Sequence, residues 1–139
     1  MADLKPDLAS ERFNEVAAQW DQKPSTVACT NKMAEAIKEM NWYSMAKSGK
    51  SSMRAMDFGC GTGLLASKIF DSDIFSEIVG VDVAEGMIEV FQEKIRRKNF
   101  EGINAAAICM DLRLLQSIRF EILGTKSPST MWDLFHNYL

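Results

Sequence analysis

The chain has 139 residues, of which 47% are hydrophobic and 25% are charged, and its formal net charge is -3. Such values are typical of one globular domain, so we expect no multidomain enzyme. The longest stretch without a charged side chain, residues 58–67, has ten residues. A membrane-spanning helix needs about 20 mainly apolar residues, and the sequence therefore predicts no membrane span and no membrane partner.

Other classes of protein are also disfavoured. The first 13 residues carry five charged side chains and no apolar run, which argues against a secretory signal and for a cytoplasmic or nuclear location. Cys29, Cys60 and Cys109 fit no metal-ligand spacing and are expected to be reduced thiols. Because His136 is the single histidine, neither a structural zinc site nor a histidine-dependent triad is expected. The slight acidic balance argues against a nucleic-acid partner.

The first 52 residues are predicted to form a helical extension that ends in a linker. Ser10 is a suitable N-cap for a first helix with one apolar stripe, made of Phe13, Val16, Ala17 and Trp20. Residues 21–24 end that helix, and Ser25 or Thr26 can cap a second one that continues to about Trp42. The polar, glycine-containing segment 47–52 then marks a boundary with an α/β domain over residues 53–139.

The domain after this boundary alternates strands with helices. Strands are predicted over 53–58, 77–82 and 103–110, and helices over 62–70, 84–98 and 112–118. This alternation predicts a parallel sheet with right-handed crossovers. Glu93 and Arg97 are spaced to form an i,i+4 pair on the longest of these helices. The basic cluster at its end, residues 94–98, is interpreted as a complement to the helix dipole, with a phosphate-binding or localisation patch as the alternative.

The segment that carries chemistry lies at the end of the first strand of this domain and reads Asp57-Phe58-Gly59-Cys60-Gly61-Thr62-Gly63. Glycines there allow a sharp turn and let a ligand reach main-chain N–H groups. A dinucleotide fingerprint would need a glycine where the chain has Leu64. The carboxylate of Asp57 would repel a pyrophosphate but suits a cationic amino group. Asp82 ends the next strand, where a carboxylate can accept both hydroxyls of a ribose.

These features resemble the class I S-adenosylmethionine-dependent methyltransferases. The resemblance extends over residues 13–115 and includes the glycine-rich segment, Val81-Asp82 and Cys109-Met110-Asp111-Leu112. It also includes Phe13 to Asp21, which is similar to the F-x-x-x-A-x-x-W-D opening helix that lies across the cofactor pocket in small-molecule-type members. The resemblance implies a Rossmann-like, doubly wound α/β fold with a mainly parallel sheet.

The resemblance also implies a set of cofactor contacts. Asp57 would orient the methionyl amine, the glycine segment the methionine and ribose, Asp82 the ribose hydroxyls, and Asp111 the adenine amino group. The full set implied for S-adenosyl-L-methionine is Trp20, Asp57, Gly59, Cys60, Gly61, Thr62, Gly63, Asp82, Val83, Met87, Asp111 and Leu112. No metal ligand and no catalytic residue is implied, because the methyl group is already activated and a general base is needed only for some acceptors.

Each of these residues also has a structural explanation. Asp57, Asp82 and Asp111 could each cap a loop or a helix, because aspartate is common at strand-to-helix junctions. Trp20 and Met87 could equally be packing residues, and nothing indicates that Cys60 is a nucleophile.

A complete family member has more strands than the chain supplies. Residues 131–138 resemble the fourth-strand motif, so we expect an incomplete sheet of about three or four strands with an open edge through which a partner or a second copy could associate. The expected function is methyl transfer to an unidentified small-molecule or protein acceptor. The alternative is a truncated, non-catalytic isoform that binds cofactor or a partner, and a nicotinamide-dependent enzyme is disfavoured by Leu64 and Asp57.

Overall fold

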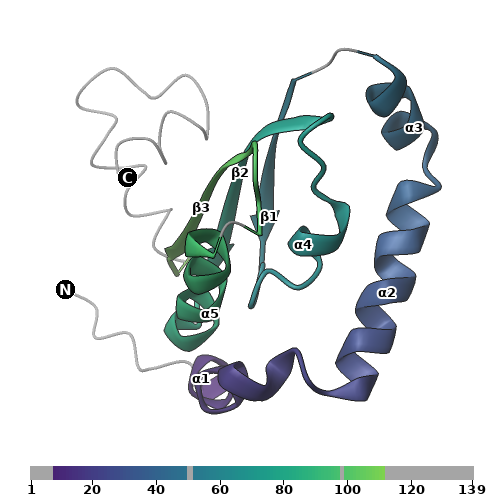
Figure 1. The fold of residues 1–139 in the computed structure, drawn as a ribbon. Coiled ribbons are helices and arrows are strands. Elements are labelled where there is room, and N and C mark those ends of the chain that lie inside the picture. The colour runs from purple at the N-terminus through teal and green to yellow at the C-terminus, as the bar shows by residue number, and fades with distance from the viewer. Residues whose placement is uncertain (1–7, 50–51, 98, 112–139) are drawn as a thin grey trace, which may run out of the picture.

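The computed structural model of the chain describes residues 8–49, 52–97 and 99–111 (Figure 1). Its elements in chain order are α1 (Leu8–Trp20), α2 (Pro24–Lys38), α3 (Asn41–Ser48), β1 (Met53–Phe58), α4 (Ala66–Ile69), β2 (Phe75–Asp82), α5 (Glu85–Arg96) and β3 (Asn104–Cys109). None of the described helices has the length and apolar character that a bilayer crossing demands.

The described strands form one parallel sheet in the order β1-β2-β3, which confirms the predicted alternation of strands and helices. Asp57 on β1 lies opposite Gly80 on β2, and Asp82 at the end of β2 lies opposite Cys109 on β3. Parallel pairing therefore places the carboxyl ends of all three strands at one edge of the sheet. In sheets of this kind the ligand crevice lies outside that edge.

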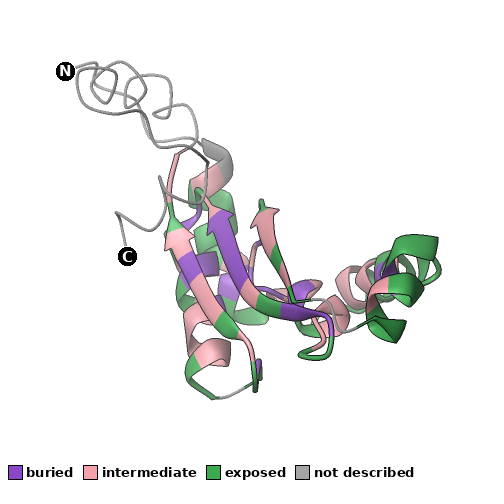
Figure 2. Cartoon of the chain, turned by 90° about the horizontal axis from the view of Figure 1, so that it is seen from above, coloured by how far each residue is buried: buried purple, intermediate pink, exposed green. Residues whose placement is uncertain are grey.

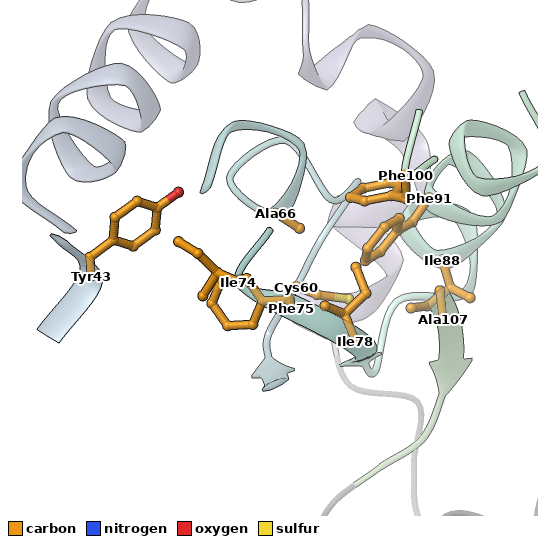
Figure 3. Packing of buried hydrophobic residues seen from close by; sticks show 10 residues of the cluster. All are labelled: Tyr43, Cys60, Ala66, Ile74, Phe75, Ile78, Ile88, Phe91, Phe100 and Ala107. Carbon is orange, nitrogen blue, oxygen red and sulfur yellow. The ribbon is translucent and has the colours of Figure 1, made fainter. Parts of the chain in front are cut away.

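The central strand β2 is the most deeply buried strand, as Figure 2 shows. Alternate side chains point to opposite faces of a strand, so Ile78 packs in one cluster and Val79 and Val81 in another. The first cluster lies between the sheet and α5, where the rings of Phe91 and Phe100 stand 5.5 Å apart (Figure 3).

The three N-terminal helices pack on this α/β core. Helix α1 lies against α5, and α2 runs along the α4 side of the sheet (Figure 1). Helix α3 brings Tyr43 into the main cluster, where its hydroxyl donates a hydrogen bond of 2.8 Å to the carbonyl of Ile69. Lys47 and Asp71 form an ion pair of 3.3 Å beside it. The N-terminal helices are thus joined to the core by specific contacts.

The predicted bounds of these helices were wrong in three places. Ser10 lies inside α1, which already includes Leu8, so it is not the N-cap. Helix α2 begins at Pro24 and not at Ser25 or Thr26, because a proline in the first turn has no N–H that needs a partner. The second helix also ends at Lys38, and a separate helix, α3, follows at Asn41. The break between them allows α3 to turn and to bury Tyr43.

The helix predicted over residues 62–70 is much shorter in the structure. Gly61 and Gly63 have φ angles of 53° and 71°, which are incompatible with a right-handed helix. Residues 61–65 consequently form turns, and α4 begins only at Ala66. The helix predicted over 112–118, the fourth-strand motif at 131–138, Leu112 and His136 lie outside the described residues.

Candidate functional site

The glycine-rich turn follows β1 at the carboxyl edge of the sheet. The N–H groups of Gly59 and Cys60 both donate to the carbonyl of Val81, at 2.8 and 3.2 Å, so the start of the turn is fixed to β2. Gly59 and Gly61 have φ angles of 74° and 53°, and a Cβ atom at either position would meet nothing within 4 Å. The turn therefore presents accessible main chain that a side chain would otherwise shield.

Gly63 has a different role, for which the sequence carries no local signal. A Cβ atom there would lie 2.5 Å from the Phe91 ring, and a Cβ atom at Gly80 would meet the same ring at 2.5 Å. The turn, β2 and α5 approach one another closely because both positions lack a side chain. A glycine whose purpose is close packing of helix and strand is a known part of nucleotide-binding turns.

The carboxylate of Asp82, at the end of β2, is hydrogen-bonded to the glycine-rich turn. One oxygen of its carboxylate accepts the N–H of Gly61 at 2.8 Å, and the other accepts the N–H of Ala84 at 2.9 Å. The second bond is the capping role considered for an isolated aspartate, and the first joins the acid to the glycine turn. A carboxylate has about four lone-pair sites, so Asp82 keeps capacity for further donors.

Asp57 is the second acid at this edge. Burial, together with the nearby negative charge of Asp82, raises the pKa of Asp57 to about 6. None of the ion pairs in the described part of the chain involves Asp57. A partly desolvated carboxylate without a cationic partner is a favourable position for a ligand ammonium group.

Thr62 does not offer its hydroxyl to a ligand. The side chain is almost fully buried, and its hydroxyl donates a 2.5 Å hydrogen bond to one carboxylate oxygen of Asp21. The other oxygen of Asp21 lies 2.5 Å from the ammonium nitrogen of Lys94. Only the main chain of Thr62 is left for the predicted ligand contact. The role of Asp21 was not predicted, although it follows Trp20 in the opening-helix motif.

The other predicted contacts surround this centre. Met87 is buried in a cluster with Ala17 and Ala84, and Trp20 packs against that cluster, so both have the packing role that was considered for them. Val83 is partly exposed beside Asp82. The Trp20 ring also meets Phe13 edge-on at 5.5 Å. Ligand contact by Trp20, Val83 or Met87 stays a prediction.

Cys60 is an inert thiol. Its side chain is buried, and burial, followed by the charges of Asp57 and Asp82, raises its pKa well above the ordinary value. A neutral, enclosed thiol is a poor nucleophile, as the sequence analysis expected.

Asp111 lies just beyond β3, next to Met110, whose N–H donates to the carbonyl of Asp82 at 2.8 Å. The three predicted acids thus follow or end three neighbouring strands. Within the described residues, no group of three or more acidic, cysteine or histidine side chains is arranged to hold a metal ion.

The basic cluster on α5 takes part in ion pairs. Glu93 binds Arg97 at 2.8 Å, which confirms the predicted i,i+4 pair, and binds Arg96 at 2.7 Å. Lys94 is paired with Asp21. Lys98 lies outside the described residues, and the choice between a complement to the helix dipole and a phosphate-binding or localisation patch stays a prediction.

Comparisons with known proteins agree with this geometry. The family model described as a methyltransferase domain matches residues 49–121, more than half of the chain. An uncharacterized methyltransferase of Schizosaccharomyces pombe is 31% identical over 90 residues, 65% of this chain and 31% of that protein. A malonyl-[acyl-carrier protein] O-methyltransferase of Bacillus anthracis is 29% identical over 113 residues, 81% of this chain and 38% of the relative. The chain thus spans about a third of the length of these curated relatives.

Among solved structures, magnesium protoporphyrin IX methyltransferase from Synechocystis PCC 6803, crystallised with bound SAH, superposes with a TM-score of 0.56 at 17% identity. The match extends over 75% of this chain and 50% of that protein. Such a likeness shows the fold, which is the Rossmann-like α/β arrangement predicted from the motifs. Together with this fold, the matched domain shows that the chain belongs to the methyltransferase-domain family.

Proposed function

We propose that the chain binds S-adenosylmethionine at the carboxyl edge of its sheet and serves methyl transfer to an acceptor. The observation that carries the proposal is the open glycine turn at Gly59 and Gly61, with the carboxylates of Asp57 and Asp82 beside it. The residues present fit this cofactor, because the turn has room for a ligand and Asp57, which has no cationic partner among the described residues, lies next to it. The structural neighbours that carry SAH or SAM support the same choice of ligand.

Each residue has a distinct role in this proposal. Asp57 binds the amino group of the methionine part, and the free main chain of the glycine turn lies along the methionine and ribose. Asp82 accepts the ribose hydroxyls with the capacity left after its bonds to Gly61 and Ala84. Asp111, beyond β3, is assigned to the adenine.

S-Adenosylmethionine supplies a methyl group that is already activated on a sulfonium. The chain therefore contributes binding and orientation, and holding two reactants in near-attack geometry can lower a barrier by about 7 to 11 kcal/mol. The curated relatives with a stated activity methylate malonyl-[acyl-carrier protein]. Because this chain spans only part of their length, the acceptor is left open, and a methyl-transfer screen against cell extract is the means of finding it.

Calorimetric titration of the chain with S-adenosylmethionine, S-adenosylhomocysteine and NAD tests the proposal. We expect binding heat with both adenosyl ligands and none with NAD, because the Asp57 carboxylate opposes a pyrophosphate. Absence of heat with both adenosyl ligands would overturn the proposal.

Asp82→Ala tests the ribose assignment. The loss of hydrogen bonds to a charged acceptor, each contributing about 1.5 to 3 kcal/mol, should weaken binding of S-adenosylhomocysteine at least about tenfold. Asp82→Asn, whose single acceptor oxygen can keep only one of the two backbone bonds, should weaken binding less than Asp82→Ala. The exposed acid Asp73, removed in Asp73→Ala, is the control and should leave affinity unchanged. Unchanged affinity in Asp82→Ala would refute the assignment.

A further inference from the structure

We propose that Asp21 is a positioning residue for the cofactor site, one that holds the glycine turn in its binding conformation through Thr62. The proposal rests on the proposed function and extends it to a residue that does not touch the ligand. Asp21 lies between α1 and α2, and Thr62 lies 41 positions further along the chain, at the centre of the turn. Their 2.5 Å hydrogen bond is a direct contact between the N-terminal helices and the turn.

The bond is held in place from the other side by Lys94. The exposed fractions of the Lys94 and Asp21 side chains are 17% and 26%, so their ion pair is shielded from much of the solvent. A shielded pair is weakened less by salt than a surface pair. Lys94 therefore places a positive charge against the second oxygen of Asp21, and α5, the end of α1 and the glycine turn meet at this one carboxylate.

The position of Asp21 is in turn set by the docking of α1. Oδ1 of Asn14 accepts the N–H of Gly86 at 2.8 Å, at the start of α5. A Cβ atom at Gly86 would lie 3.2 Å from the backbone of Asn14, so the absent side chain allows this close approach. Two residues thus attach α1 to α5: Asn14, near the middle of α1, and Asp21, just beyond the end of α1. Between these two attachments, Ala17 packs on Ala84 and Met87.

The glycine turn needs this support because its backbone has unusual conformational freedom. Thr62 stands between Gly61 and Gly63, two glycines with positive φ that have many accessible conformations when unrestrained. A turn that is ordered before the ligand arrives loses less conformational entropy on binding. Asp21 therefore acts on ligand affinity by fixing Thr62, and it does so without a contact of its own.

The test uses the full chain at a temperature well below its unfolding midpoint, with two measurements. The first is the affinity for S-adenosylhomocysteine by calorimetry, and the second is amide hydrogen exchange of residues 59–63 without ligand. Asp21→Ala and Thr62→Val should each weaken affinity about tenfold, and both should speed exchange in the turn. The double variant should be no weaker than the single variants, because both substitutions remove the same bond. Thr62→Ser, which keeps the hydroxyl, should restore affinity and slow exchange.

Glu93→Gln is the matched control, because it removes an acid from α5 that pairs only with the exposed Arg96 and Arg97 among the described residues. It should leave affinity and exchange at wild-type values. Wild-type affinity in a folded Asp21→Ala, additive losses in the double variant, or a lowered melting temperature with unchanged affinity would each overturn the proposal. If the wild-type chain binds no adenosyl ligand, the proposed function fails, and the exchange rates in Thr62→Val and Thr62→Ser still decide whether Asp21 orders the turn. If Asp21→Ala fails to fold, Thr62→Val and Thr62→Ser decide the proposal, because they remove and keep the same bond from its donor side.

Discussion

At the scale of single residues, the buried carboxylate of Asp57 has two opposing effects. It lowers the stability of the ligand-free chain, and it favours binding of a cation. Burial beside Asp82 raises its pKa from 3.8 to about 6. Between about pH 4 and pH 6 the folded chain thus holds a proton on Asp57 that the unfolded chain has already released. The stability that this proton provides is complete below about pH 4. That stability is lost as pH rises through about 6, where the folded carboxyl ionises. At neutral pH the acid is therefore destabilising until a cation binds it.

Asp57→Asn should accordingly make the ligand-free chain more stable at pH 8, by about 1 to 2 kcal/mol after allowance for solvent screening, and equally stable at pH 4. The same variant should lose most of its affinity for S-adenosylhomocysteine, because the amide cannot pair with an ammonium group. Urea unfolding at both pH values and calorimetry measure the two effects.

Asp71→Asn is a control for which the expected change in stability at pH 8 has the opposite sign. The backbone N–H of Asp73, with Lys47 beside it, holds the pKa of Asp71 below its ordinary value, so that acid stabilises the chain when ionised. Its amide variant should be less stable than the wild type at pH 8. An Asp57→Asn chain that is less stable than the wild type at pH 8 would contradict the role given to burial.

The glycines of the turn make a second prediction at this scale. Gly63→Ala adds both a positive-φ alanine, which costs about 1 to 2 kcal/mol, and a clash with the Phe91 ring, which costs about 1 to 3 kcal/mol. Gly59→Ala adds the backbone cost alone, because its Cβ atom would stand in open space. Urea unfolding should therefore show a loss of about 2 to 5 kcal/mol for Gly63→Ala and about 1 to 2 kcal/mol for Gly59→Ala. Equal losses would mean that the packing against Phe91 does not explain the glycine.

At the scale of elements, the strands were easier to predict than the helices. The runs around Val79 and Ala107 are short and apolar, so composition alone marks them as strands, and no end of either strand differs from its predicted bound by more than two residues. Helix ends depend on contacts distant in sequence. Tyr43 reaches the core only because the helix breaks after Lys38, and Thr62 is held in a turn by Asp21. Neither contact has a local signal.

The candidate site shows the same division between local and distant signals. The three acids and the glycines were predicted because each lies at or just beyond the carboxyl end of a strand in a fixed pattern, and parallel pairing brings such positions to one edge. The contact of Gly63 and Gly80 with Phe91 could not be predicted, because it depends on how closely α5 approaches β2. The capture of the Thr62 hydroxyl by Asp21 likewise joins positions 41 residues apart. Sequence patterns thus indicated a candidate site, and only the fold shows which of its groups are already hydrogen-bonded.

At the scale of the whole molecule, the site is made by elements from most of the described chain. The acids come from β1, β2 and the end of β3, while α1 and α5 hold the turn through Asp21, Lys94 and Asn14. A ligand bound there contacts several elements that pack on one another, so it should stabilise all of them together. The free energy gained is about 2.7 kcal/mol when the free ligand is at 100 times its dissociation constant.

For a domain of this size, such a gain corresponds to a rise in melting temperature of about 10 °C. Thermal unfolding followed by circular dichroism at 222 nm, with S-adenosylhomocysteine at 100 times the measured dissociation constant, should show this rise in a single transition. NAD at the same concentration should give none. S-Adenosylhomocysteine at that concentration should raise the melting temperature of Asp82→Ala by at most about half as much, because the ligand is then at no more than about 10 times the dissociation constant of the variant. A melt in two steps, of which only the later one responds to the ligand, would mean that the N-terminal helices unfold independently of the site and do not support it.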